Sequence, residues 1–311
     1  MTRTFDLLVV GDANPDVVLS GAPGELPWGQ RERLVETGAL LLGGSAAITA
    51  CGAARLGLRT AFAGRVGDDP AGRFCLDALR ERGVDVSGCV VDPAVATALT
   101  VVIANGEDRA ILTAPGCLPL LGADDVDPGL AASARHVHVS SFYLQPRLAA
   151  GLPEWFAELR EGGATTSLDT NDDPAGRWDG GIAAALAQTD VFLPNEAEAL
   201  ALTGAGDVRA AARSLAGISG RLVVVKRGAD GALAWTAEGP AAVSGPPAAP
   251  VDTVGAGDSF NAGFLAGYLG GDDIAGGLRL AAACGALSTR AAGGTAAQPT
   301  LAEARIGMGG V

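Results

Sequence analysis

Residues 251–260, VDTVGAGDSF, hold two acidic residues on either side of a run of small ones. Gly255 and Gly257 allow the positive φ angles and the close backbone approach of a tight turn. The apolar run that follows predicts a helix, so the backbone N–H groups of 255–258 point out of its first turn. Such N–H groups, reinforced by the helix dipole, bind anions. The segment therefore predicts an anion hole formed by Gly255, Ala256 and Gly257.

Asp258 stands beside these N–H groups. Its carboxylate could accept the proton of a hydroxyl group, while the N–H groups stabilise the charge that develops on a phosphoryl group attacked by that hydroxyl. The spacing alone also fits a residue that merely caps the helix. Further motifs are needed to separate the two interpretations.

The composition indicates a globular protein. The chain has 311 residues, of which 48% are hydrophobic and 18% charged, with a net charge of −13. It lacks the basic cluster that nucleic-acid binding requires, so we expect no nucleic-acid partner. The apolar run at 5–10 is too short for a signal peptide, and no stretch reaches the about 18 apolar residues of a membrane span. Five scattered cysteines and two histidines disfavour a zinc site, and we expect a reduced, cytoplasmic protein without a membrane partner.

Short apolar strands alternate with helical patterns along most of the chain. Strands are expected at 5–11, 136–142, 165–171, 191–195 and 221–228, and helices at 45–57, 69–83, 181–188, 196–202, 208–217, 260–270 and 274–290. This alternation predicts an α/β fold with a mostly parallel central sheet flanked by helices. His136 and His138 fall on one face of a strand, where we expect a packed or surface role and not a catalytic one.

Two segments, about 14–42 and 95–115, carry hairpin patterns that do not fit the alternation. They predict a small accessory β-sheet that acts as a lid, inserted in a single domain of residues 1–311. We expect its exposed edges to pair between two subunits in a homodimer.

The first βα turn is not G-x-G-x-x-G, and a G-x-x-x-x-G-K-[ST] loop is absent. Instead, residues 251–260 resemble the D-T-x-G-A-G-D signature of the ribokinase-like (PfkB) carbohydrate kinases at every fixed position. Four other segments resemble further motifs of that family: LLGGSAAITACGAARLG, RVGDDPAGRFCLDALRERGVD, LPNEAEA and VVKRGADGA. The resemblance covers essentially the whole chain and favours a catalytic Asp258 over a capping one.

The resemblance implies an ATP-dependent sugar kinase that uses Mg²⁺, with Asp258 as the general base. Asn195 and Glu198 would organise Mg²⁺ and the ATP phosphates through water. Their spacing also fits a capping box at a helix start, and both roles can hold at once. Gly228 would let the chain approach the nucleotide, and Lys226 either points toward phosphate or is solvated at the strand end.

Asp252 would shape the loop, and in family members that need K⁺ it lies at the site of that ion. For the sugar, Asn14 and Asp16 resemble the hydroxyl-binding N-x-D of the family, although Asn-Pro-Asp also fits a simple turn. Gly43 and Gly44 would let the substrate lie against bare backbone. Ile48 stands where the family usually has Asn, so one hydroxyl partner is missing or supplied elsewhere.

Residues 166–178 resemble a family segment in which Arg often follows Asn171, but here Asp172 follows, with Arg177 as a candidate replacement. The loss of that Arg favours an unphosphorylated sugar. The leading hypothesis is transfer of the γ-phosphoryl group of ATP to a primary hydroxyl of a pentose or ketohexose. The alternatives are a nucleoside kinase, which Trp28 and Ile48 keep open, and a catalytically silent sugar or nucleotide sensor.

Overall fold

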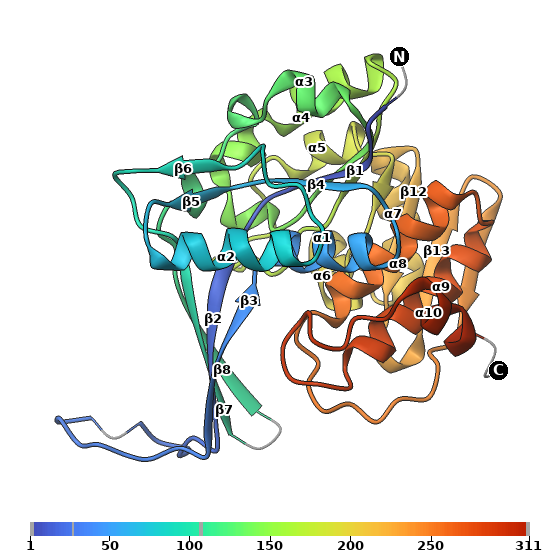
Figure 1. Cartoon of the computed structure of the whole chain (residues 1–311). Helices are drawn as coiled ribbons and strands as arrows, with labels where there is room; N and C mark the ends of the chain where they lie inside the picture. The colour runs from blue at the N-terminus through green and yellow to red at the C-terminus, as the bar shows by residue number, and fades with distance from the viewer. Residues whose placement is uncertain (1–2, 27, 106–107, 309–311) are drawn as a thin grey trace.

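The structure is a computed structural model that describes residues 3–26, 28–105 and 108–308. Its central sheet has eight strands in the order β14-β13-β12-β11-β10-β9-β1-β4 (Figure 1). Their bounds are β1 Phe5–Val10, β4 Thr60–Ala63, β9 Ala134–Val139, β10 Thr165–Leu168, β11 Val191–Phe192, β12 Leu222–Lys226, β13 Ala232–Thr236 and β14 Gly239–Val243. Neighbours from β4 to β12 pair in parallel, and β13 and β14 add an antiparallel edge. The predicted α/β fold with a mostly parallel sheet is confirmed.

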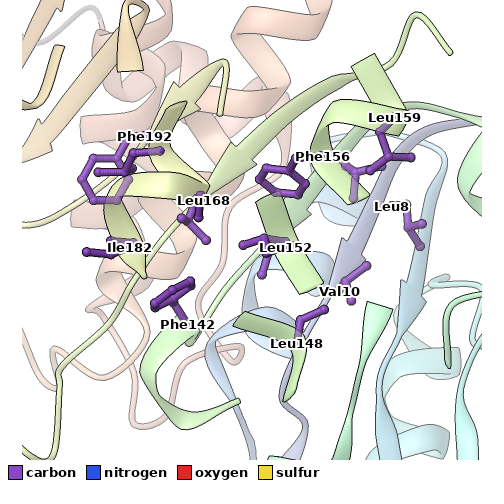
Figure 2. Close-up of a cluster of buried hydrophobic side chains, with 14 of the residues drawn as sticks. Leu8, Val10, Phe142, Leu148, Leu152, Phe156, Leu159, Leu168, Ile182 and Phe192 are labelled. Carbon is purple, nitrogen blue, oxygen red and sulfur yellow. The ribbon is translucent and has the colours of Figure 1, made fainter. Parts of the chain in front are cut away.

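Helices cover both faces of this sheet. One face packs against α4 (Pro146–Glu161), α5 (Ile182–Ala187) and α7 (Val208–Ser219). Figure 2 shows part of this core, to which β1 contributes Leu8 and Val10. The other face, which includes Leu7 and Val9, packs against α1 (Ser45–Arg55), α8 (Ala256–Gly270) and α9 (Ile274–Ser288). Alternate residues of β1 therefore enter two different cores, as expected for a parallel strand buried on both faces.

The remaining elements complete the two layers. They are α2 (Pro70–Glu81), α3 (Pro128–Ala132), α6 (Glu196–Thr203), α10 (Leu301–Met308) and the short paired strands β5 (Arg65–Gly67) and β6 (Val90–Asp92). Asp69 caps α2 by accepting a 2.7 Å hydrogen bond from the backbone N–H of Gly72, and Pro70 is the first helical residue. Across these described ranges, none of the helices combines the length and apolarity that a membrane crossing requires.

A second sheet projects from the body of the molecule (Figure 1). It has four strands in the order β3-β2-β7-β8, namely Thr37–Gly43, Asn14–Ser20, Leu99–Asn105 and Asp108–Ala114. These strands lie in or at the edges of the two segments in which the sequence predicts an accessory sheet. Leu40, Ile111 and Leu112 of this sheet are more than half exposed.

His136 and His138 are fully buried in β9. Their ring nitrogens form hydrogen bonds of 2.7 to 2.9 Å with the hydroxyl groups of Thr165, Ser167 and Ser140. Burial lowers the pKa of the two rings to about 3 and about 4, so both are neutral at neutral pH. The predicted packing role is confirmed.

Candidate functional site

The candidate residues gather where the parallel strands end. Asp12 follows β1, Asp169 follows β10, Asn195 follows β11, and Lys226 is the last residue of β12. The carboxyl ends of parallel strands meet at one edge of a sheet, which is where open α/β proteins bind ligands. The N-terminus of α8 reaches the same edge, because Nζ of Lys226 lies 3.7 Å from the position that a Cβ on Gly257 would occupy.

At the helix start predicted as an anion hole, only one of the two glycines expected to adopt a positive φ does so, since Gly257 lies inside α8 with a helical backbone. Gly255 is the N-cap of α8 with a φ of 72°, and an added Cβ would lie 2.5 Å from Cα of Gly294. Glycine is therefore required there by conformation and by contact. Ala256 and Gly257 are the first two residues of α8, whose N–H groups have no acceptor in a preceding helical turn. The N–H of Ala256 donates a 3.3 Å hydrogen bond to the Thr253 carbonyl, which closes the loop.

Asp258 is the third residue of α8 and not its cap, so the interpretation of Asp258 as a helix cap is wrong. Its side chain is only 7% exposed. Burial, and then the charge of Asp169, raise the pKa of Asp258 to about 8, although Lys226 and a hydrogen bond from Ser45 act to lower it. A carboxyl group with a pKa this close to neutrality can both take up and release a proton.

Lys226 is buried and paired, so its interpretation as a solvated strand-end residue is wrong. Its Nζ donates a 2.6 Å hydrogen bond to Oδ2 of Asp169, and Nδ2 of Asn261 donates to the same oxygen at 2.5 Å. Asp169 is fully buried and Lys226 is 9% exposed. Burial disfavours the ammonium charge, yet the carboxylates of Asp169 and Glu198 raise the pKa of Lys226 above its ordinary value. The sequence did not predict Asp169 or Asn261: Asp169 fell inside the strand expected at 165–171, whereas the structure ends β10 at Leu168, so that Asp169 directly follows it.

Asn195 and Glu198 form the predicted capping box at the start of α6. The backbone N–H of Glu198 donates to Oδ1 of Asn195 at 2.9 Å, and the backbone N–H of Asn195 donates to Oε2 of Glu198 at 2.8 Å. Burial, and then the charge of Asp169, raise the pKa of Glu198 to about 7, while Lys226 lowers it.

A divalent cation would be held only partly by protein. In the part of the chain that the structure describes, no group of three or more His, Cys, Asp or Glu could hold a metal ion. Mg²⁺ usually keeps several waters and binds one or two carboxylates plus substrate phosphates. Glu198 fits that mode of binding, because its buried carboxyl lies in the first turn of α6, within reach of the charges of Asp169 and Lys226.

Asn14 and Asp16 lie on β2, which pairs with β3. Nδ2 of Asn14 donates to Oδ1 of Asp16 at 2.7 Å. A Cβ on Gly43 would lie 2.1 Å from that same oxygen, so Gly43 leaves the space in which the carboxylate lies. Burial raises the pKa of Asp16 to about 7, and the charge of Asp12 adds to this effect. The pair forms part of a β-strand, and the predicted alternative of a simple turn is wrong.

Asp12, which the sequence analysis did not single out, holds the start of α1. Its two carboxylate oxygens accept hydrogen bonds of 3.0 Å from the backbone N–H groups of Ser45 and Ala46. Gly44, the N-cap, has a φ of 90°, and a Cβ there would lie 2.6 Å from the Asp12 carbonyl oxygen. Gly44 is thus required by the close approach of Asp12.

Two strained residues meet next to this helix start. Ser141 and Asn171 follow β9 and β10 and have φ angles of 60° and 53°, which are uncommon for residues other than glycine. Nδ2 of Asn171 donates to Oγ of Ser141 at 2.9 Å and also to Oγ of Ser45. Backbone strain of this kind concentrates at functional sites.

Ile48 lies against the loop that carries the anion hole. It is 3% exposed, and its Cγ2 and Cδ1 atoms lie 3.1 Å and 2.5 Å from the positions that a Cβ on Gly255 and on Gly294 would occupy. The side chain therefore supports the loop and offers no hydrogen bond.

Asp252 ties this loop to the segment after α9. Its Oδ1 accepts from the N–H of Val254 at 3.0 Å, and its Oδ2 accepts from the N–H of Gly293 at 2.8 Å. Arg109 of β8 lies 3.7 Å from the same carboxylate, so the four-stranded sheet reaches the loop. Gly228 begins a short turn after β12 with a φ of 54°.

Two cavities lie away from these residues. One, of about 450 Å³, is lined by Arg3, Arg135 and Tyr268 among others, at the opposite edge of the sheet. The other, of about 420 Å³, is lined by residues that include Cys51 and Arg82. The candidate site is therefore identified by its chemistry and by its place at the strand ends, which is the usual ligand position in this kind of sheet.

The fold and the site define a phosphotransferase of the ribokinase-like class. Residues 5–301 match the family described as pfkB family carbohydrate kinase. The chain belongs to this family, whose members transfer phosphate to an alcohol group.

Two relatives and one solved structure show the range of the resemblance. An ATP-dependent ribose-1-phosphate kinase of Halopiger xanaduensis is 34% identical over 284 residues, which are 91% of each chain. A fructokinase of Klebsiella pneumoniae is 34% identical over 273 residues, 83% of this chain and 88% of that one. The structure of Arabidopsis thaliana ribokinase complexed with ribose and ATP is 25% identical, with a TM-score of 0.85 over 99% of both chains.

The raised pKa of Asp258 predicts that this residue makes the folded state less stable as the pH rises. A carboxyl whose pKa is about 8 when folded, against an ordinary 3.8, holds a proton that the unfolded chain gives up. The free energy of unfolding therefore decreases as the pH rises from the lower of these two pKa values to the higher. Asp258→Asn removes this titration, so we expect its stability relative to wild type to be higher at pH 8 than at pH 5 by about 1 kcal/mol or more.

Urea unfolding at both pH values, without nucleotide or Mg²⁺, measures this difference. Asp16 and Glu198 titrate in both proteins, so their contributions cancel. Asp77→Asn, at an exposed position on α2, serves as the control and should show no such dependence. An equal difference between Asp258→Asn and wild type at the two pH values would contradict the raised pKa.

Proposed function

We propose that the protein is an ATP-dependent sugar kinase that transfers the γ-phosphoryl group of ATP to a primary hydroxyl of a small sugar of the pentose or ketohexose type. The observation that carries this proposal is the buried carboxyl of Asp258 in the first turn of α8, with Nζ of Lys226 next to Gly257. A base, a cation and a set of backbone N–H groups thus meet at one point. Phosphoryl transfer requires this combination of positioning and charge stabilisation.

In the proposed mechanism, Asp258 accepts the proton of the acceptor hydroxyl as its oxygen attacks the γ-phosphorus. The bond to the bridging oxygen breaks, and ADP leaves with the electron pair. The N–H groups of Gly255 and Gly257 and the ammonium of Lys226 stabilise the charge on the transferring group, while the N–H of Ala256, also predicted for this role, donates to the Thr253 carbonyl. Asn195 and Glu198 would hold Mg²⁺ through water, and when bound the ion neutralises phosphate charge.

The acceptor would lie between α1 and β2. Asp16 offers two carboxylate oxygens to adjacent hydroxyls, and Asn14 fixes their orientation through its 2.7 Å hydrogen bond. The Asp16 carboxylate and the Asp12 backbone fill the space that a Cβ on Gly43 and on Gly44 would occupy, so these glycines would shape the acceptor site by positioning Asp16 and α1. Gly228 would let the chain approach the nucleotide. The charge of Asp12 acts on both Asp16 and Asp258, which supports a position for the acceptor between these two carboxyls.

The chain is proposed to act as one domain of residues 1–311, with the four-stranded sheet as the lid. Closure of that sheet would exclude water and limit hydrolysis of ATP. A cytoplasmic location agrees with the five cysteines, all of them free thiols.

A K⁺ site would be formed by Asp252 together with backbone carbonyl groups of residues 291–294. The hydrogen bond from the N–H of Gly293 to Asp252, which joins these two segments, supports such a site. The same carboxylate faces the guanidinium of Arg109 at 3.7 Å, so a bound K⁺ would share it with a second cation.

A kinase of phosphorylated sugars is a second candidate, because the Halopiger xanaduensis relative is a ribose-1-phosphate kinase. Arg177, the candidate partner for such a phosphate, is 71% exposed and pairs with Asp179 at 3.5 Å. A nucleoside acceptor has less support, since Trp28 is 81% exposed and does not offer a buried face to a base. The buried and intact Asp258, Asn195 and Glu198 argue against a silent sensor.

An ADP-release screen tests the proposed function. The acceptors are pentoses, ketohexoses, deoxy-keto acids, ribose 1-phosphate and nucleosides, each with and without K⁺. We expect release with a pentose or ketohexose, and a decrease in kcat of about 10²-fold or more in Asp258→Asn because the base is lost. Activity only on nucleosides or ribose 1-phosphate would replace the substrate class, no activity with any acceptor would favour the sensor, and near-native kcat in Asp258→Asn would refute the mechanism.

Asp16→Ala separates the acceptor site from the nucleotide site. The variant loses the carboxylate that would grip two hydroxyls, so we expect the KM for the sugar to rise about 10-fold or more while the KM for ATP changes less than about 2-fold. Steady-state kinetics with each substrate varied in turn provide both values. Equal increases in the two KM values would remove Asp16 from the sugar site.

The exposed apolar residues of the four-stranded sheet predict a homodimer through the lid. Sedimentation at micromolar concentration should give twice the 30.8 kDa of one chain. The double variant Ile111→Lys, Leu112→Lys places one charge on each face of the edge strand β8 and should sediment as a monomer. A wild-type protein with the mass of one chain would contradict the proposal.

A further inference from the structure

Building on the proposed function, we propose that Asp169 is a positioning residue for phosphoryl transfer, whose carboxylate fixes the ammonium of Lys226 beside the anion hole of α8. Asp169 itself would not touch the substrates. Its effect would pass through Lys226 and Asn261.

The contacts of one carboxylate oxygen carry this proposal. Oδ2 of Asp169 accepts 2.6 Å and 2.5 Å hydrogen bonds from Nζ of Lys226 and Nδ2 of Asn261. Asn261 lies three residues after Asp258, so both project from the same face of α8. A single oxygen therefore joins the ends of β10 and β12 to the helix that carries the base.

A lysine needs such a partner at this position. Its side chain is long and flexible, with a compact charge that can point in many directions. Here Lys226 is 9% exposed and Asp169 is fully buried, so each charge depends on the other for compensation. Nζ of Lys226 lies 3.7 Å from the position that a Cβ on Gly257 would occupy. The pair therefore holds the ammonium next to the proposed position of the transferring phosphoryl group.

The charges around the pair make its effect measurable. Glu198 of α6, Asp258 of α8 and His138 of β9 all respond to Asp169 and Lys226, and Asp12 acts on Asp258 from the end of β1. The charge of Asp169 raises the pKa of Asp258, and Lys226 lowers it. Removing the Asp169 charge should therefore lower the pKa of the base, an effect that a purely structural role would not produce.

The test compares Asp169→Asn with Asp190→Asn. Asp190 is a matched control because it is 11% exposed in its side chain and pairs with Arg221 at 2.9 Å, just before β11 at the opposite edge of the sheet. We expect both variants to lower the thermal midpoint. Only Asp169→Asn should lower kcat, by about 10²-fold, and move the acidic limb of the kcat profile to lower pH.

Lys226→Met provides a second test, since it removes the charge and keeps much of the side-chain volume. If Asp169 acts through Lys226, the double variant Asp169→Asn, Lys226→Met should be no slower than the slower single variant. Multiplicative losses, or an Asp169→Asn variant with kcat within about 2-fold of wild type, would overturn the proposal. Should Asp169→Asn fail to fold, unchanged kcat in Lys226→Met would overturn it as well.

Binding of the ATP analogue AMP-PNP with Mg²⁺, measured by calorimetry, requires no acceptor. We expect Asp169→Asn to weaken it about 10-fold and Asp190→Asn to leave it within about 2-fold of wild type. Absence of ADP release in the wild type with every acceptor would overturn the proposed function. Unchanged analogue affinity in Asp169→Asn would overturn the role of Asp169 alone.

Discussion

The buried ion pair between Asp169 and Lys226 is the interaction on which the rest of the site depends. The two residues are 57 positions apart and lie at the ends of different strands, and Asn261 adds α8 to the same carboxylate. A buried charge without its partner costs several kcal/mol, so any shift of β10, β12 or α8 that separates these atoms is strongly disfavoured. The relative positions of Asp258, the proposed base, and of the predicted anion hole follow from this constraint.

The same edge of the sheet gathers carboxyl groups whose charged form is disfavoured by burial. Burial is the main cause that raises the pKa of Asp12, Asp16, Glu198 and Asp258, and Lys226 is the cation that acts on the last two. An arrangement of this kind sacrifices stability for function, because the carboxyl groups lose their hydration before any ligand replaces it. The Mg²⁺ ion of a bound nucleotide would bring positive charge to the carboxyl groups next to α6.

Much of the fold could be predicted because strands and helices alternate, but several elements were missed, among them α4 and β14. Helix α4 contains Pro153, and β14, GPAAV, is built from residues with low strand propensity, so tertiary packing determines both. In the site, the signature at 251–260 and the capping box of Asn195 and Glu198 could be recognised because each is local. Asp169 and Asn261 could not, since their meaning lies in contacts between residues 92 positions apart.

The position of Ile48 suggests that the choice of acceptor and the geometry of the proposed phosphoryl-transfer site depend on different residues. The side chain of Ile48 packs behind Gly255 and Gly294, where a hydrogen-bonding residue is common in the family, and so it supports the loop of the predicted anion hole and offers no hydrogen bond to a sugar. The polar groups near Asp258 come instead from Ser45, and from Asn171 through Ser45. Residues on α1, at the strand ends and on the accessory sheet can then change while α8 keeps its geometry. Relatives that act on ribose 1-phosphate and on fructose, both 34% identical to this chain, are the outcome expected of such a division.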